Sequence, residues 1–239
     1  MSPIKETWDK WFDNNIDIPG RTIYIGSVHE HDGYESGVDA FMAESVIKAM
    51  HVLESKNSDP ITILMNNPGG DWYHGMAIYD VIKNAKSHCT VKAFGYAMSM
   101  GSIILQAADK RIMMPHSKFM IHFGSSEFSN HMKTVERGVE EEKRLNYIME
   151  NIYLDVMLEK EEKMGHGYLA KILGEVMTQQ YALEYPPPPQ PTTYSFSKKL
   201  ETKREELRKV LREMLNFDTY LTAEETVALG FADEVYSNN

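Results

Sequence analysis

The chain has 239 residues, of which 42% are hydrophobic and 25% are charged, and its formal net charge is −10. This composition is that of an ordinary globular protein, and the acidic balance disfavours nucleic acid as a partner. No apolar run approaches the roughly 18 residues of a membrane span, and residues 1–6 show no signal-peptide pattern. The single cysteine, Cys89, excludes an intrachain disulfide. We therefore expect a soluble, cytoplasmic protein without a membrane partner.

Strands and helices alternate in the first half of the chain, after a polar N-terminal segment, 1–20, that ends in a Pro-Gly turn. Short apolar runs predict strands, and apolar residues at helical spacing predict helices. Strands are expected at 21–26, 61–65, 90–94, 111–114 and 118–121, and helices at 38–53, 75–82 and 103–108. This alternation indicates an α/β layer architecture.

The second half of the chain is predominantly helical. A long charged helix is predicted over 132–163. The composition then changes in 165–197, where the proline run at 186–191 ends any helix and favours an extended conformation. We expect 165–197 to be a peripheral excursion rather than part of the core. The remaining elements are a helix over 198–215, a capped helix start at 222–225 and a strand at 233–236.

One serine is placed as a nucleophile would be. The sequence Gly-Tyr-Ala-Met-Ser-Met-Gly-Ser at 95–102 joins a predicted strand to a predicted helix. A serine on such a sharp turn holds its hydroxyl clear of the backbone, next to the positive end of a helix dipole. Ser99 is therefore a candidate nucleophile. A lone serine in such a turn is more commonly a helix cap, so the interpretation depends on partner residues.

Serine hydrolysis also needs a base, a group that orients the base, and donors for the oxyanion. His122 ends an apolar strand and is the candidate base; its alternative role is a core histidine. Asp218, in a loop between helices, is the candidate orienting carboxylate, or else a capping or solvated residue. Gly69 and Gly70 can bring backbone N–H groups close, or form only a tight turn. No spacing typical of metal ligands is present, and we expect neither a metal nor a cofactor.

The chain resembles the Clp protease proteolytic subunit, ClpP, in motifs that follow the family's order and cover about 21–160 and 207–236. The motifs are Asn-Pro-Gly-Gly at 67–70, Gly-Met-Ala-Ile-Tyr-Asp at 75–80, Gly-Tyr-Ala-Met-Ser-Met-Gly at 95–101, Pro-His-Ser-Lys-Phe-Met-Ile-His at 115–122, Asp-Thr-Tyr-Leu-Thr-Ala-Glu at 218–224 and Ala-Leu-Gly-Phe-Ala-Asp at 228–233. The resemblance implies Ser99 as nucleophile, His122 as general base and Asp218 as its orienting carboxylate. It also implies that the N–H groups of Gly70 and Met100 form the oxyanion hole.

The same resemblance implies a spiral of ββα units of the crotonase-like superfamily with a long protruding helix. The peptidase domain would cover 21–239, interrupted by an insertion at about 165–205. Family members form stacked rings around a proteolytic chamber, fed with polypeptides by a separate ATP-driven unfoldase. The implied partners are therefore polypeptide substrates, further copies of the chain and an ATP-dependent unfoldase.

Two further regions depart from the family pattern. Residues 123–130 lack the Gln-Pro pair and the longer glycine-rich strand that hold substrate by strand addition and join the rings. Thr62 and Leu64 stand where the family has aromatic side chains for docking the unfoldase. Ring stacking and unfoldase docking are therefore the properties in which this chain is expected to differ.

The function expected from these observations is that of a serine endopeptidase inside a self-compartmentalised homo-oligomer. One alternative is a head-maturation protease of a tailed virus, which can use the same fold. Another is a catalytically silent ring subunit that assembles with an active paralogue. An acyl-CoA hydratase or isomerase of the same superfamily is disfavoured, because those enzymes use backbone N–H groups and acidic residues rather than a serine–histidine pair.

Overall fold

A computed structural model describes residues 10–27, 37–125, 127, 129, 131–181 and 194–237. The chain divides into two compact units. The first unit comprises Met1–Met120, Leu221–Val227 and Ala232–Asn239, and the second comprises Ile121–Tyr220 and Ala228–Phe231. Among the described residues, no helix combines the length and apolarity that are needed to cross a bilayer.

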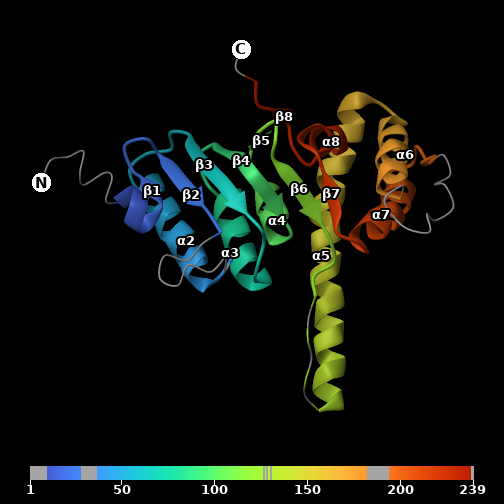
Figure 1. The fold of residues 1–239 in the computed structure, drawn as a ribbon, viewed down its shortest axis with the longest axis horizontal. Coiled ribbons are helices and arrows are strands. Elements are labelled where there is room, and N and C mark those ends of the chain that lie inside the picture. Colours follow the sequence, from blue (N-terminus) through green and yellow to red (C-terminus); the bar gives the residue numbers. More distant parts are fainter. Residues whose placement is uncertain are drawn as a thin grey trace, which may run out of the picture. The chain divides into compact units, whose positions relative to one another are not determined.

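The first unit is built on a predominantly parallel sheet with strand order β1-β2-β3-β4-β5-β8 and with β6 beside β4 (Figure 1). Only the β1–β2 pair among these is antiparallel. Along β2 and β3, side chains alternate between buried and half-buried, as the two faces of a pleated sheet require. The strands are β1 (Ile16–Asp17), β2 (Thr22–Ile25), β3 (Ile61–Asn67), β4 (Cys89–Met98), β5 (Lys110–Met113), β6 (Lys118–Ile121) and β8 (Glu234–Val235).

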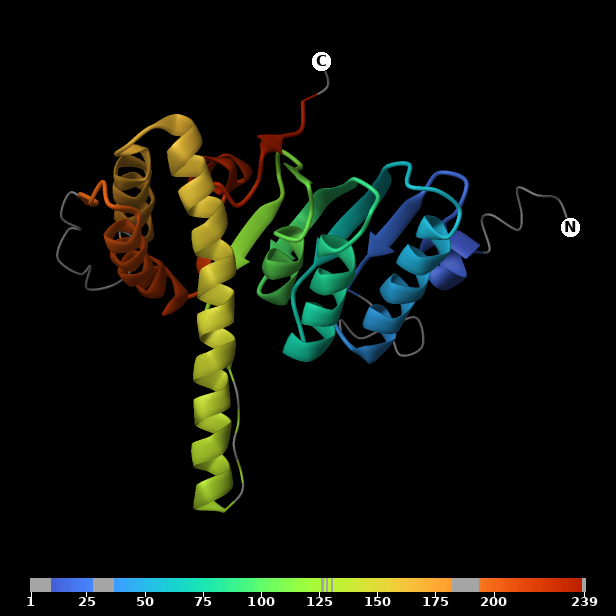
Figure 2. The same ribbon diagram turned by 180° about the vertical axis from the view of Figure 1, so that it is seen from behind.

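Helices α2 (Ala40–Glu54), α3 (Trp72–Lys83) and α4 (Met100–Leu105) connect these parallel strands. Figure 2 shows α2 and α3 in front of the strands, on one face of the sheet. The side chain of Asp39 caps α2 by accepting from the Met42 N–H at 2.8 Å, and Asp71 caps α3 by accepting from His74 at 2.9 Å. The helices and strands predicted for this half of the chain are present, but β1 was not predicted, and α4 occupies Met100–Leu105 rather than 103–108.

Strand β4 pairs with two different neighbours because it is irregular near Gly95. Thr90 to Ala93 pair with β5, whereas Tyr96 to Met98 pair with β6. Gly95 has a φ of +53°, and a Cβ there would lie 2.4 Å from the side-chain oxygen of Asn66. Such an irregularity bends a strand and redirects its end. It allows β4 to run up to the serine turn, four residues beyond its predicted end.

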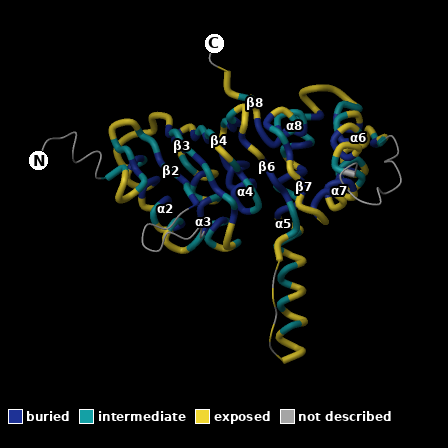
Figure 3. Tube along the Cα trace, viewed as in Figure 1, coloured by how far each residue is buried: buried dark blue, intermediate teal, exposed yellow. Residues whose placement is uncertain are grey.

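The second unit contains α5 (Met132–Met164), α6 (Tyr168–Tyr181) and α7 (Leu200–Leu215). The second half of α5 packs into this unit, whereas none of its residues before Met149 is buried (Figure 3). Its first half extends away from α6 and α7 in both ribbon views (Figures 1 and 2). The predicted long protruding helix is therefore confirmed. The strand β7 (Thr219–Leu221) and helix α8 (Ala223–Leu229) follow α7, with α8 preceded by the predicted cap, in which Thr222 and Glu225 bond reciprocally.

The prediction that residues 165–197 are peripheral is wrong for α6. Leu169, Leu173, Val176 and Met177 form one apolar stripe at helical spacing, and all four are buried. Burial of this stripe makes α6 part of the core of the second unit. The proline run at 186–191 lies outside the described residues, and an insertion at about 165–205 stays a prediction.

The start of α6 is attached to α5 by one buried carboxylate. Glu161 accepts hydrogen bonds from the N–H groups of Gly167 and Leu169, both at 2.8 Å, and from Lys203 at 3.2 Å. Burial opposes ionisation of Glu161, but these donors outweigh it and lower the pKa of its carboxyl. Glu161 thus caps α6 from the preceding helix.

Candidate active site

Ser99 lies at the junction between β4 and α4, as predicted. Its φ of 49° and ψ of −122° fall outside the regions that residues with a side chain favour. The Ser99 amide donates to the carbonyl of Met120 on β6 at 2.9 Å, and helix α4 begins at the next residue, Met100. A serine held in a strained strand-to-helix turn is the arrangement that exposes a nucleophilic hydroxyl.

The glycine loop after β3 passes directly beside this turn. Gly69 has a φ of +111°, and a Cβ there would lie 2.5 Å from the Cβ of Ser99. Only glycine permits so close an approach. The loop forms two hydrogen bonds with Val38: the Gly69 carbonyl accepts from the Val38 N–H at 2.6 Å, and the Asp71 N–H donates to the Val38 carbonyl at 2.8 Å. This pairing does not use the Gly70 N–H.

Asn67 holds the glycine loop from within the core, a role that sequence reasoning missed. Its fully buried side chain accepts from the Gly69 N–H at 2.9 Å and donates to the carbonyl of Gly26 at 2.6 Å. The asparagine directly before Pro-Gly-Gly was visible in the motif. Its partner Gly26 lies 41 positions away, so only the folded chain reveals the bridge.

His122 and Asp218 are brought together in the second unit. The imidazole Nδ1 lies 2.9 Å from the Asp218 Oδ1, although 96 positions separate the residues in the chain. The histidine side chain is 26% exposed and the aspartate side chain 58% exposed, so the pair is open to solvent. When Nδ1 donates its proton to the carboxylate, Nε2 is left as a proton acceptor.

The five predicted site residues are thus distributed between the two units. Ser99, Gly70 and Met100 belong to the first unit, and His122 and Asp218 belong to the second. In the first unit Gly69, the residue before Gly70, adjoins Ser99 and Met100, and in the second unit His122 contacts Asp218.

The single cysteine is not a competing nucleophile. Cys89 begins β4 and is buried. Burial, together with the nearby carboxylates of Asp109 and Glu54, raises the pKa of its thiol to about 12. The reactive form of cysteine is the thiolate, which is scarce at neutral pH when the pKa is so high.

Comparison with known proteins identifies one family. A family model described as Clp protease matches residues 33–185. The ATP-dependent Clp protease proteolytic subunit of Deinococcus radiodurans is 37% identical over 139 residues, covering 57% of this chain and 64% of that protein. Subunit 2 from Pseudomonas aeruginosa is 30% identical over 131 residues, covering 54% of this chain and 65% of that protein. The chain therefore spans less than two thirds of the length of these curated relatives.

A solved structure shares the fold. A ClpP1 mutant from Listeria monocytogenes superposes with a TM-score of 0.60 at 22% sequence identity, covering 93% of this chain and 94% of that one. This likeness confirms the predicted ClpP-like α/β fold with its long helix. The comparisons do not favour a head-maturation protease or a silent subunit over a ClpP-type proteolytic subunit.

Proposed function

Because the chain belongs to the Clp protease family, we propose that it is a serine endopeptidase of the ClpP type. Its substrates would be polypeptides, and its reaction the hydrolysis of their peptide bonds by a Ser-His-Asp triad. No cofactor is required for this chemistry, because the nucleophile, the base and the oxyanion donors all belong to the polypeptide.

In the proposed mechanism, Ser99 attacks the scissile carbonyl while the Nε2 of His122 takes the hydroxyl proton. Asp218 holds the imidazole in the required tautomer and stabilises its protonated form. The N–H groups of Gly70 and Met100 stabilise the negative charge that develops on the carbonyl oxygen. His122 then gives its proton to the leaving amine, and water repeats the sequence on the acyl-enzyme.

The observation that carries the proposal is the 2.9 Å contact between His122 and Asp218. A carboxylate that pairs with the Nδ1 of an imidazole orients the ring and leaves Nε2 to act as the general base. The strained backbone of Ser99 and the glycine loop that adjoins it support the same conclusion from the first unit.

We also propose that the protein acts as a homo-oligomeric ring in the cytoplasm. The family implies such rings and an ATP-dependent unfoldase that supplies substrate. Thr62 and Leu64 are both half-buried on β3, and neither offers an aromatic ring. We therefore expect the unfoldase partner to differ from those that dock through aromatic pockets.

The first experiment is to replace the nucleophile. Ser99→Ala should lower kcat for peptide hydrolysis on the order of 10⁶-fold, because no other group attacks the carbonyl. Labelling with a fluorophosphonate, followed by peptide mapping, should modify Ser99 in the wild type and nothing in the variant.

The matched control is Ser125→Ala, which removes an exposed hydroxyl shortly after His122. This variant should hydrolyse peptides and accept the label as the wild type does. Activity of Ser99→Ala within tenfold of the wild type would overturn the assignment of the nucleophile.

A further inference from the structure

The end of α7 holds the residues that follow each member of the histidine–aspartate pair. The carbonyl of Leu215 accepts the N–H of Phe123, the residue after the histidine, at 2.7 Å. The carbonyl of Met214 accepts the hydroxyl of Thr219, the residue after the aspartate, also at 2.7 Å. A displacement of this end of α7 therefore displaces both partners of the 2.9 Å contact.

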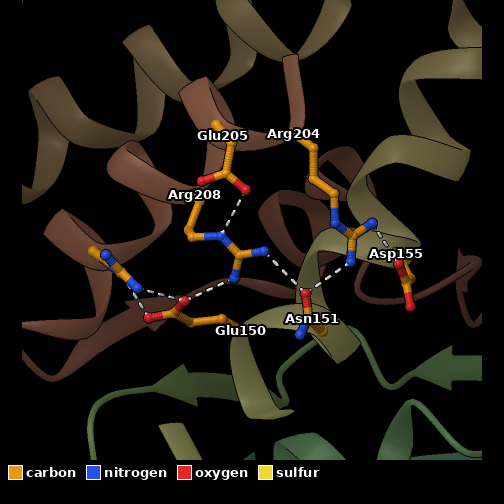
Figure 4. Close-up of polar contacts among 7 residues, drawn as sticks. Glu150, Asn151, Asp155, Arg204, Glu205 and Arg208 are labelled. Carbon is orange, nitrogen blue, oxygen red and sulfur yellow. Dashed lines mark hydrogen bonds and ion pairs between the residues drawn. The ribbon is translucent and has the colours of Figure 1, made fainter. Parts of the chain in front are cut away.

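A single buried carboxylate on α5 attaches to the last two turns of α7. The Glu150 side chain is only 3% exposed. Its Oε2 accepts from Arg208 Nη1 at 2.8 Å, and its Oε1 accepts from Arg212 Nε at 2.7 Å. A third bond joins Arg212 Nη2 to Oε2 at 3.1 Å. Figure 4 shows Glu150 facing Arg208 across the two helices.

Arg208 is itself fixed from several sides. Its guanidinium donates to Asn151 at 3.0 Å and to Glu205 at 3.3 Å (Figure 4). It also lies 4.8 Å from the ring centre of Tyr147. Its side chain is 5% exposed, so neither it nor Glu150 can exchange its partner for water. A buried charge that loses its partner is strongly unfavourable. The Glu150–Arg208 contact therefore prevents α7 from shifting along α5.

We propose that Glu150 is a positioning residue for catalysis: through Arg208 and Arg212 it sets where Asp218 meets His122. This proposal rests on the proposed function in one respect: His122 and Asp218 must act in peptide hydrolysis. Its structural content, that Glu150 controls the contact between the pair, stands independently. A misplacement of about 1 Å in such a contact can lower a rate about 10²-fold.

The same two helices offer a matched control. Asp155 on α5 accepts from Arg204 on α7 at 2.7 Å, but Arg204 lies near the start of α7, away from the end that holds the pair. The Asp155 side chain is 67% exposed. Asp155→Asn therefore removes an ion pair between α5 and α7 without releasing the end of α7.

The direct test is the ¹⁵N NMR spectrum of the His122 imidazole, which reports its tautomer and its Nδ1 hydrogen bond. In Glu150→Gln, the His122 resonances should move toward those of Asp218→Asn, in which the partner carboxylate is lost. In Asp155→Asn, they should stay at the wild-type positions. Arg212→Gln, which changes a half-exposed side chain and leaves Arg208 paired, should move them in the same direction by less.

Kinetics supply the second readout. Glu150→Gln should lower kcat by about 10²-fold while KM stays within about twofold, because it disturbs the base and not substrate binding. Unchanged His122 resonances in a folded Glu150→Gln protein would overturn the proposal. If that variant fails to fold, unchanged His122 resonances in Arg212→Gln would overturn it instead. Inactivity of the wild type would refute the proposed function instead, since the NMR comparison needs no activity.

Discussion

The serine part and the histidine part of the proposed site are held in place by different means. Ser99 is presented by backbone geometry, namely its own positive φ and the close approach of Gly69. His122 and Asp218 are held by side-chain and helix contacts that depend on charged residues of α5 and α7. The first arrangement should therefore respond to changes in shape and the second to changes in charge.

The largest effect within this comparison is expected for Asp218→Asn, which removes charge from the histidine part and preserves shape. The amide favours the wrong imidazole tautomer, and kcat should fall by about 10⁴-fold. Steady-state hydrolysis of a fluorogenic peptide, with circular dichroism to verify folding, measures this. Full activity would mean that no carboxylate at this position is needed. Asp233 is a poor substitute, because it is already paired with Arg111 at 2.7 Å.

A change of shape in the serine part should have the next largest effect. In Gly69→Ala, the new Cβ would lie 2.5 Å from the Cβ of Ser99, on a backbone with a φ of +111°. We expect kcat/KM to fall on the order of 10²-fold. The free energy of unfolding in urea should fall by about 1–3 kcal/mol, the cost of a strained backbone position.

Gly174→Ala is the control for this change of shape. Among the described residues, no atom beyond the neighbouring backbone of α6 lies within 4 Å of an added Cβ at Gly174. Its activity should be unchanged and its stability higher by about 0.5–1 kcal/mol, because alanine is the better helix former. Equal losses of activity in both variants would show that the effect at Gly69 is not local.

The smallest effect on activity is expected from Glu161, a charged residue that takes no part in the proposed mechanism. Glu161→Gln removes the carboxylate that caps α6, and stability at neutral pH should fall by about 1–3 kcal/mol with little change in kcat. The pKa of Glu161 is lower in the folded protein, since its hydrogen-bond donors outweigh burial. Its stabilising contribution is therefore present above the pKa of an unfolded glutamate, about 4.3, and is lost as the pH falls through the lower folded value.

Urea unfolding at neutral pH and near pH 3 tests this sign. The difference in stability between wild type and Glu161→Gln should shrink on acidification. Glu175→Gln, which changes an exposed carboxylate on α6, should match the wild type at both pH values. A difference that grows toward low pH would contradict the assignment of the stabilising charge to Glu161.

The serine turn could be predicted because its determinants are close together in the chain. An apolar strand run, small or flexible residues beside the serine and an apolar helix start all lie within 90–105, and local preferences specify such a turn. The prediction for α6 failed for the opposite reason. The apolar stripe through Leu169 and Leu173 was readable, but whether a stripe is buried depends on the helices that cover it.

The alternation of strands and helices, the capped start of α8 and the junction that carries Ser99 could all be predicted from the sequence. These follow from side-chain periodicity and backbone preference over a few residues. The folded chain was needed to reveal the bridge from Asn67 to Gly26, the contact of His122 with Asp218 and the attachment of Glu150 to α7. Such contacts join residues 41 to 96 positions apart, and their energies depend on burial and on distances that exist only once the chain has folded.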